Sequence, residues 1–100
     1  MANEPIRTDQ VIAEVLPTML RDRGTSLRAL AAAIDISPSH LSRALRGEEG
    51  KHLSLEAFEA IAAELEVDPS FFREYRIELA VAGVRARVEL ANLVFDRLDP

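Results

Sequence analysis

Apolar residues recur every three or four positions between Val11 and Leu20, which predicts a first helix with one buried face. Thr8 can cap the start of this helix, and Gly24 suits the left-handed position that follows its end. Pro17 lies inside the predicted helix, where it removes one backbone hydrogen bond and is expected to bend the axis. The first element predicted along the chain is therefore a bent amphipathic helix.

Two short helices joined by a tight turn are predicted between Ser26 and Gly47. The inward-facing residues of the first are Leu27, Leu30, Ala31 and Ile34. Ser37 and Pro38 start the second, because serine is a good N-cap and proline suits the first helical position. Leu41, Ala44 and Leu45 face inward on this helix, and Ser39, Ser42, Arg43 and Arg46 share its outer face. A short helix with such a small, polar and Arg-bearing face fits a DNA major groove.

A fourth helix is predicted after Ser54, which can serve as its N-cap. Its buried side is formed by Leu55, Phe58, Ile61, Ala62 and Leu65. Asp68 and Pro69 then repeat the pattern of a cap followed by proline and open a last helical segment. Phe71 and Phe72, at the start of this segment, are expected to anchor it on the core.

The last segment carries apolar residues at alternating spacings of four and three, a seam of the kind that pairs helices. The seam consists of Ile77, Val81, Val84, Val88, Ala91, Phe95 and Leu98. Its other side is not polar either, because Leu79, Leu90 and Leu93 lie away from the seam. A helix that is apolar nearly all round is normally buried, so we expect one face on the core and the seam in a dimer interface.

The course of this segment allows more than one interpretation. Residues 84–90 alternate between apolar and polar, as a strand would, although their Ala, Leu, Arg and Glu content favours a helix. Gly83 can divide the segment, since glycine costs about 1 kcal/mol inside a helix. One bent helix and two separate helices both remain compatible with the sequence.

The run from Leu30 to Gly47 resembles the helix-turn-helix of the lambda-repressor-like (Cro or XRE-type) regulators. Ala31 stands at the helix crossing, where the family has a small residue, and Ile36 and Leu41 stand at its buried positions. The resemblance extends to about Arg76. It implies an all-α fold, a helix-turn-helix bundle of about five to six helices, to which the apolar periodicity of residues 77–98 adds an extended apolar C-terminal helical segment. The expected parts are a flexible arm (1–8), a DNA-binding domain (9–76) and a C-terminal dimerisation segment (77–100).

Two residues depart from the family pattern. Asp35 stands where the family usually has glycine at a left-handed turn, and Asp tolerates that conformation better than most residues. Leu27 replaces a polar residue that contacts phosphate in many members. A modest strain at the turn and the loss or replacement of one phosphate contact are therefore expected.

The resemblance also implies which residues contact DNA. Pro38, Ser39 and Arg43 are the expected base contacts, with Arg43 foremost because arginine can bind guanine O6 and N7 with two hydrogen bonds. The expected phosphate contacts, which set the register on the duplex, are Thr25, Ser26, Arg28, His40, Ser42, Arg46 and Lys51. A homodimer would place two such sites about one helical turn apart on a pseudo-palindromic operator.

The charge distribution refines this hypothesis. The formal net charge of the 100 residues is −5, which argues against indiscriminate nucleic-acid binding. The segment from Arg21 to His52 nevertheless holds six basic and four acidic residues, so it is locally positive at +2. An acidic body behind a basic face weakens binding that depends mainly on counterion release. We expect a selective binder of double-stranded DNA.

The composition also bears on the cellular location of the protein and on whether it is an enzyme. The chain has no cysteine, no basic-then-apolar leader and no apolar run long enough for a membrane span, which predicts a cytoplasmic protein that is nucleoid-associated when bound to DNA. His40 and His52 stand apart, and the four glycines form no phosphate loop, so no metal, cofactor or enzymatic activity is expected. The alternative function is a protein-interaction module, an antitoxin or adaptor, whose apolar C-terminal helix binds another protein.

Overall fold

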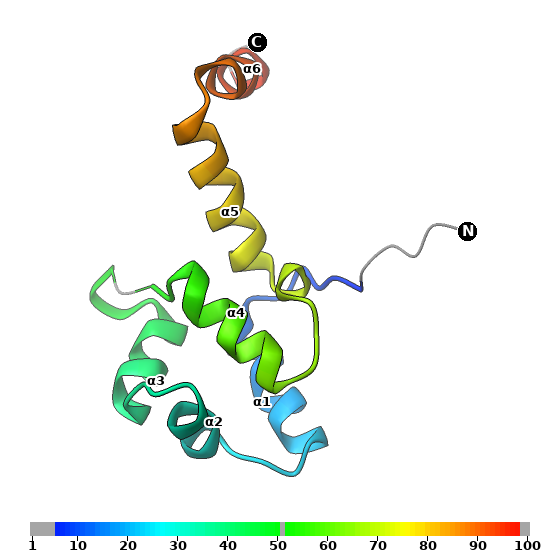
Figure 1. Ribbon diagram of the computed structural model, residues 1–100, viewed down its shortest axis with the longest axis vertical. Coiled ribbons are helices and arrows are strands. Elements are labelled where there is room, and N and C mark those ends of the chain that lie inside the picture. The colour runs from blue at the N-terminus through cyan, green and yellow to red at the C-terminus, as the bar shows by residue number, and fades with distance from the viewer. Residues whose placement is uncertain (1–5, 51, 99–100) are drawn as a thin grey trace.

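The computed structural model describes residues 6–50 and 52–98 (Figure 1). These residues form helices α1 (Ile12–Asp22), α2 (Leu27–Ala33), α3 (Pro38–Arg46), α4 (Leu55–Glu64), α5 (Arg73–Ala86) and α6 (Val88–Leu98), with short 3₁₀ turns η1 (Glu48–Gly50) and η2 (Pro69–Phe71). The described ranges contain no strand, so residues 84–90 are not a strand despite their alternation. The predicted all-α fold of about five to six helices is confirmed.

One core joins α1, α3, α4 and the residue before α5. Its most deeply buried large side chains are Leu16, Leu41, Ile61 and Phe72. Ala31 of α2 is fully buried as well, where a larger side chain would separate α2 from its neighbours. Phe72 stacks edge-on against Phe71 and lies at 6.2 Å from the ring of Phe58, so the predicted aromatic anchor is present.

The start of α1 differs from the prediction. Thr8 does not cap the helix, because α1 begins four residues later, after Val11, whose side chain makes no capping hydrogen bond. The cap comes instead from α5, where the two carboxylate oxygens of Glu74 accept the Ile12 N–H at 3.1 and 2.9 Å. A carboxylate at this position also interacts favourably with the helix dipole. The end of α1 agrees with the prediction, with Gly24 at φ +66°.

The segment before α1 is held against the start of α5. The Thr8 N–H donates to the Phe71 carbonyl at 3.1 Å. Arg76 donates through Nη2 to the Thr8 carbonyl and to Asp9, and through Nη1 to the carbonyls of Ser70 and Phe71. Thr8, the last residue of the expected flexible arm (1–8), is therefore hydrogen-bonded to the residues around the start of α5, while residues 1–5 lie outside the described part of the chain.

The turn between α2 and α3 has the conformation that the sequence predicts. Asp35 lies in the left-handed region at φ 60°, and the Ile36 N–H reaches back to the Ala31 carbonyl at 2.9 Å. The end of α4 repeats this geometry, with Glu66 at φ 56°. Its continuation also agrees with the prediction, because Asp68 accepts the Ser70 N–H at 2.8 Å at the start of η2. The hydrogen bonds from Ser70 lower the pKa of Asp68.

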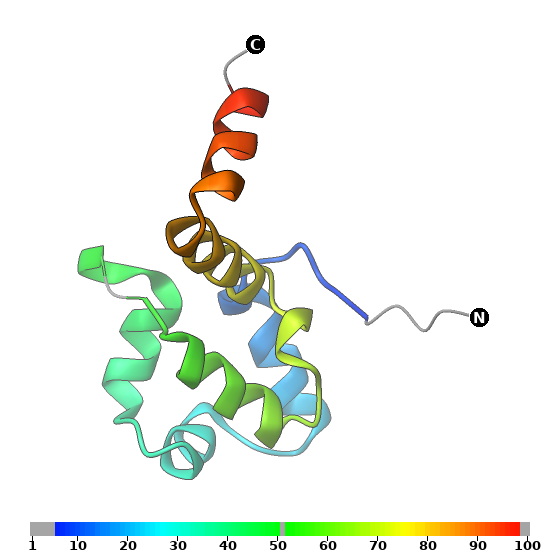
Figure 2. The same ribbon diagram turned by 45° about the horizontal axis from the view of Figure 1, so that its top comes forward.

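The C-terminal segment is two helices rather than one. The break lies at Arg87, whose backbone is extended (φ −136°, ψ 111°), and Gly83 lies within α5. The predicted continuous seam is therefore wrong: Ile77, Val81 and Val84 lie on α5, and Val88 with the remaining seam residues lies on α6. Figures 1 and 2 show α5 rising from the bundle and α6 turning away at its far end. The radius of gyration, 15.4 Å, exceeds the roughly 13 Å of a compact chain of this length accordingly.

Replacement of Glu74 tests whether α5 secures the start of α1. Glu74→Ala leaves the Ile12 N–H without its acceptor, so we expect the free energy of unfolding to fall by about 1–2 kcal/mol. The matched control is Glu64→Ala at an exposed position of α4, which should change it by less than about 0.5 kcal/mol. Urea denaturation followed by circular dichroism measures both, and equal losses would contradict the role of Glu74.

Candidate nucleic-acid interface

Helix α3 turns one side into the core and the other to the surface. Leu41 has no exposed surface and Ala44 only 6%, whereas Pro38, Ser39 and His40 are exposed. The Ser37 hydroxyl accepts the His40 N–H at 3.2 Å, and Gly47 ends the helix at φ +68°. Both ends of α3 are thus fixed by local chemistry, and the buried side determines which residues point outward.

The expected base contacts lie on this outward side. Pro38 and Ser39 form the first turn of α3, and Arg43 follows Ser39 by one helical turn on the same face. Arg43 is half-buried, and its guanidinium forms no ion pair with the residues that the structure describes. A recognition helix contacts base edges with the side chains of its outer face, and Arg43 presents its guanidinium donors on that face.

Helix α2 packs against α3, as Figures 1 and 2 show, and three of the expected phosphate contacts lie at its start. Thr25, Ser26 and Arg28 are all exposed there. Ser26 caps α2 by accepting the Ala29 N–H at 3.1 Å, which leaves its own O–H free to donate to a phosphate oxygen. Leu27 is half-buried and packs against the core, so it makes no polar contact in place of the usual family residue.

Arg46 is engaged within the chain, a feature that the sequence analysis did not predict. Its Nη1 donates to the Ser42 hydroxyl at 3.1 Å, and its Nη2 pairs with the Glu48 carboxylate at 3.0 Å. Two expected phosphate contacts, Ser42 and Arg46, are therefore linked to each other and to an acidic side chain. The pairing depends on the turn at Gly47, which brings Glu48 back toward α3. Lys51, another expected phosphate contact, lies outside the described residues.

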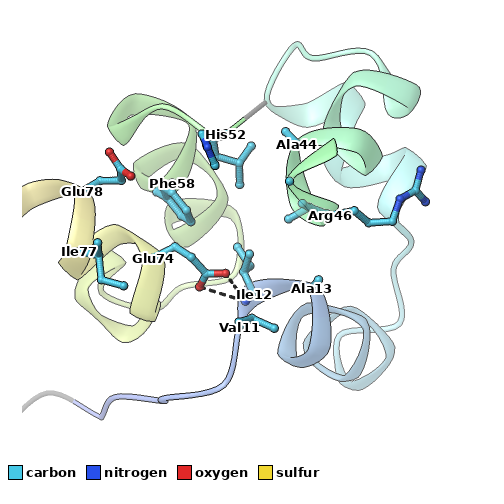
Figure 3. Close-up of a pocket in the computed structure, with 13 residues that line it drawn as sticks. Val11, Ile12, Ala13, Ala44, Arg46, His52, Phe58, Glu74, Ile77 and Glu78 are labelled. Carbon is cyan, nitrogen blue, oxygen red and sulfur yellow. Dashed lines mark hydrogen bonds between the residues drawn. The ribbon is translucent and has the colours of Figure 1, made fainter. Parts of the chain in front are cut away.

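A cleft of about 420 Å³ opens beside the end of α3, between α1, α4 and α5 (Figure 3). Its walls are mainly apolar, with Val11, Leu53, Phe58 and Ile77 among the lining residues. Glu74 reaches across it to Ile12, as the dashed lines in Figure 3 show. No local sequence pattern predicts this cleft, because its walls come from four separate elements.

The described residues offer no arrangement for metal binding. No group of three or more His, Asp or Glu side chains within residues 6–50 and 52–98 is placed to hold an ion. His40 and His52 are both exposed, His40 on α3 and His52 in the loop before α4. None of the described helices is long and apolar enough to cross a membrane.

Comparison with known proteins identifies the fold of this interface. The sequence model of a protein family described as helix-turn-helix matches residues 19–72, which include α2, α3 and α4. Members of this lambda-repressor-like family are DNA-binding regulators and generally not enzymes. No curated protein and no solved structure matches the chain.

Removal of the Glu48 carboxylate tests whether it competes with phosphate for Arg46. Glu48→Gln should strengthen binding to duplex DNA by about 0.2–1 kcal/mol and steepen the salt dependence by about one released counterion. Glu56→Gln, which removes the same charge from an exposed position of α4, is the control and should have a smaller effect. Fluorescence anisotropy over a range of salt concentrations measures both variants. If the two variants change the DNA affinity and its salt dependence equally, the effect comes from net charge alone, and Glu48 does not compete with phosphate for Arg46.

Proposed function

The chain belongs to the lambda-repressor-like helix-turn-helix family, and on that premise we propose that it is a sequence-specific transcriptional regulator. It binds double-stranded DNA as a homodimer on a pseudo-palindromic operator. The observation that carries this proposal is the outward face of α3, where Ser39 and Arg43 lie one turn apart while Leu41 holds the other side in the core.

Arg43 supplies most of the sequence selectivity in this proposal. Its guanidinium has the fork of donors that fits guanine O6 and N7, and it forms no ion pair with the described residues. Ser39 adds a weaker and more adaptable contact, and Pro38 packs against a base edge. Thr25, Ser26 and Arg28 at the start of α2, with His40 and Ser42 on α3, bind phosphates and set the register.

The proposed dimer uses the C-terminal helices. Large apolar side chains are exposed there, including Ile77 and Val81 on α5 and Val88, Phe95 and Leu98 on α6. Extended apolar surface of this kind marks an interaction site in a water-soluble protein. Val84 and Ala91, which are half-buried, complete the interface. Residues 77–98 therefore act as the dimerisation segment, although α5 itself begins within the DNA-binding unit.

The same surface supports a second candidate function. The exposed apolar side chains of α6 are equally suited to bind a different protein, as in an antitoxin or an adaptor. In that case DNA binding is secondary or absent. Light scattering of the purified chain separates the two candidates, because the homodimer has twice the mass of the monomer. A monomer that dimerises at no accessible concentration favours the second candidate.

Selection from random duplex DNA tests the proposed function. The wild-type chain should enrich a pseudo-palindrome whose half-sites lie about 34–36 Å apart, one turn of the double helix. Arg43→Ala should weaken binding to the enriched site by about 1–3 kcal/mol and relax one base position in each half-site. Arg73→Ala, an exposed position on α5, is the matched control and should leave the base preference unchanged. No enrichment at low salt would exclude a sequence-specific regulator.

A further inference from the structure

The cleft beside the end of α3 has the size of a small-molecule site. Its volume of about 420 Å³ falls within the roughly 300–1,000 Å³ of such sites, and its walls are mainly apolar. Among these walls stand the carboxylates of Glu74 and Glu78, and neither forms an ion pair with a residue that the structure describes (Figure 3). We infer from this combination that the cleft binds a small amphipathic amine, a molecule with an apolar body and a protonated amino group. The inference goes beyond the proposed function and does not require that the chain binds DNA.

Glu74 retains hydrogen-bonding capacity inside the cleft. A carboxylate has about four acceptor positions, and the only donor to Glu74 among the described residues is the Ile12 N–H, which its two oxygens share at 3.1 and 2.9 Å. The side chain is half-buried beside apolar walls, so its access to water is restricted. A protonated primary amine brings a positive charge and three N–H donors, and hydrogen bonds to charged groups are roughly twice as strong as neutral ones. Glu74 is therefore placed to bind such a group.

The charge of the lining also favours a cation. Glu78 follows Glu74 by four residues on α5, so the two carboxylates lie on the same side of the helix. Arg46 lines the cleft from α3, but its guanidinium pairs with the Glu48 carboxylate at 3.0 Å and points away from Glu74 in Figure 3. His52, also in the lining, carries no formal charge at pH 7. An anionic ligand is repelled by the two glutamates, and a neutral one leaves the charge of Glu74 without a counterion.

The apolar part of the cleft suits a compact molecule better than a helix. Leu53 and Phe58 are almost fully buried, whereas Val11 and Ile77 are partly exposed, so an apolar ligand gains affinity by covering the second pair. One turn of an α-helix with its side chains, about 10 Å wide and 5.4 Å long, has roughly the volume of the whole cleft. A helix of two or more turns therefore does not fit inside it, and a small molecule does.

The site is separate from the candidate DNA interface. Ala44 and Gly47 line the cleft from the end of α3, and Ile77 lines it from α5. Ser39 and Arg43, the proposed base contacts, are not among the lining residues, so a ligand here leaves the outer face of α3 open to DNA. The ligand contacts the DNA-binding unit and the first residue of the proposed dimerisation segment together.

Three probes with the same apolar body test the inference: phenylbutylamine, phenylbutanol and phenylbutyrate. Each is titrated into the isotope-labelled full chain, and the amide and methyl chemical shifts give both the dissociation constant and the location of binding. The largest changes should fall at Leu53, Phe58 and Ile77. The amine should bind about three- to tenfold more tightly than the alcohol, and the carboxylate more weakly than the alcohol.

Glutamine variants test the role of the two carboxylates. Glu74→Gln and Glu78→Gln each remove one charge and keep the shape of the side chain, so each should lower the preference for the amine over the alcohol about threefold. In Glu74→Gln the amide oxygen can still accept the Ile12 N–H, and Glu78 is exposed, so we expect both variants to fold, which circular dichroism checks. Glu64→Gln, which removes the same charge from an exposed position of α4 outside the cleft, is the control and should keep the preference.

The outcomes distinguish this inference from its alternatives. A preference for the amine that falls in both glutamine variants, with shift changes at the cleft, supports it. Equal affinities for the three probes, changes centred on α6, or no binding of the amine at about 10 mM overturn it. Shift changes of the same cleft residues on dilution without a probe show that a second copy fills the cleft, and they overturn it as well. If the amine preference holds but no DNA sequence is selected, only the proposed function fails.

Discussion

The candidate DNA interface depends on the close packing of α2 against α3. Ala31 and Leu41 have no exposed surface, and the left-handed turn at Asp35 sets the angle at which α3 leaves α2. Because Leu41 and Ala44 are committed to the core, Ser39 and Arg43 can only point away from it. The proposed DNA-binding face is therefore a consequence of burial on the opposite side, and it persists only while that packing is intact.

Long-range polar contacts secure the frame behind α3. Glu74 of α5 caps α1, and Arg76 joins the segment before α1 to η2. These contacts attach the first half of α5 to the bundle, while the second half projects from it with its apolar face exposed. Helix α5 thus packs on the core through its first half and, in the proposed dimer, contacts a second copy of the chain through its second half.

The sequence predicted those features that depend on local chemistry. The caps at Ser37 and Ser54, the left-handed turns at Gly24 and Asp35 and the buried sides of α2 to α4 all follow from short-range patterns, and the structure confirms them. The cap of α1 could not be predicted from the sequence, because Glu74 lies 62 residues from Ile12. The link between Arg46 and Glu48 could not be predicted either, because it depends on the turn at Gly47. The break at Arg87 carries no proline or glycine signal, so the spacing suggested a continuous seam. The DNA contacts themselves remain predictions from family membership.

The central claim is that DNA lies on the outer face of α2 and α3, and titration of a short duplex into the isotope-labelled chain tests it most directly. Amide chemical shifts report which backbone groups sense the ligand. We expect the largest changes between Thr25 and Gly47, above all around Ser39 and Arg43, with the amides of α5 and α6 little affected. Changes centred on α5 and α6, with α3 unperturbed, would contradict it and would assign binding to the C-terminal helices.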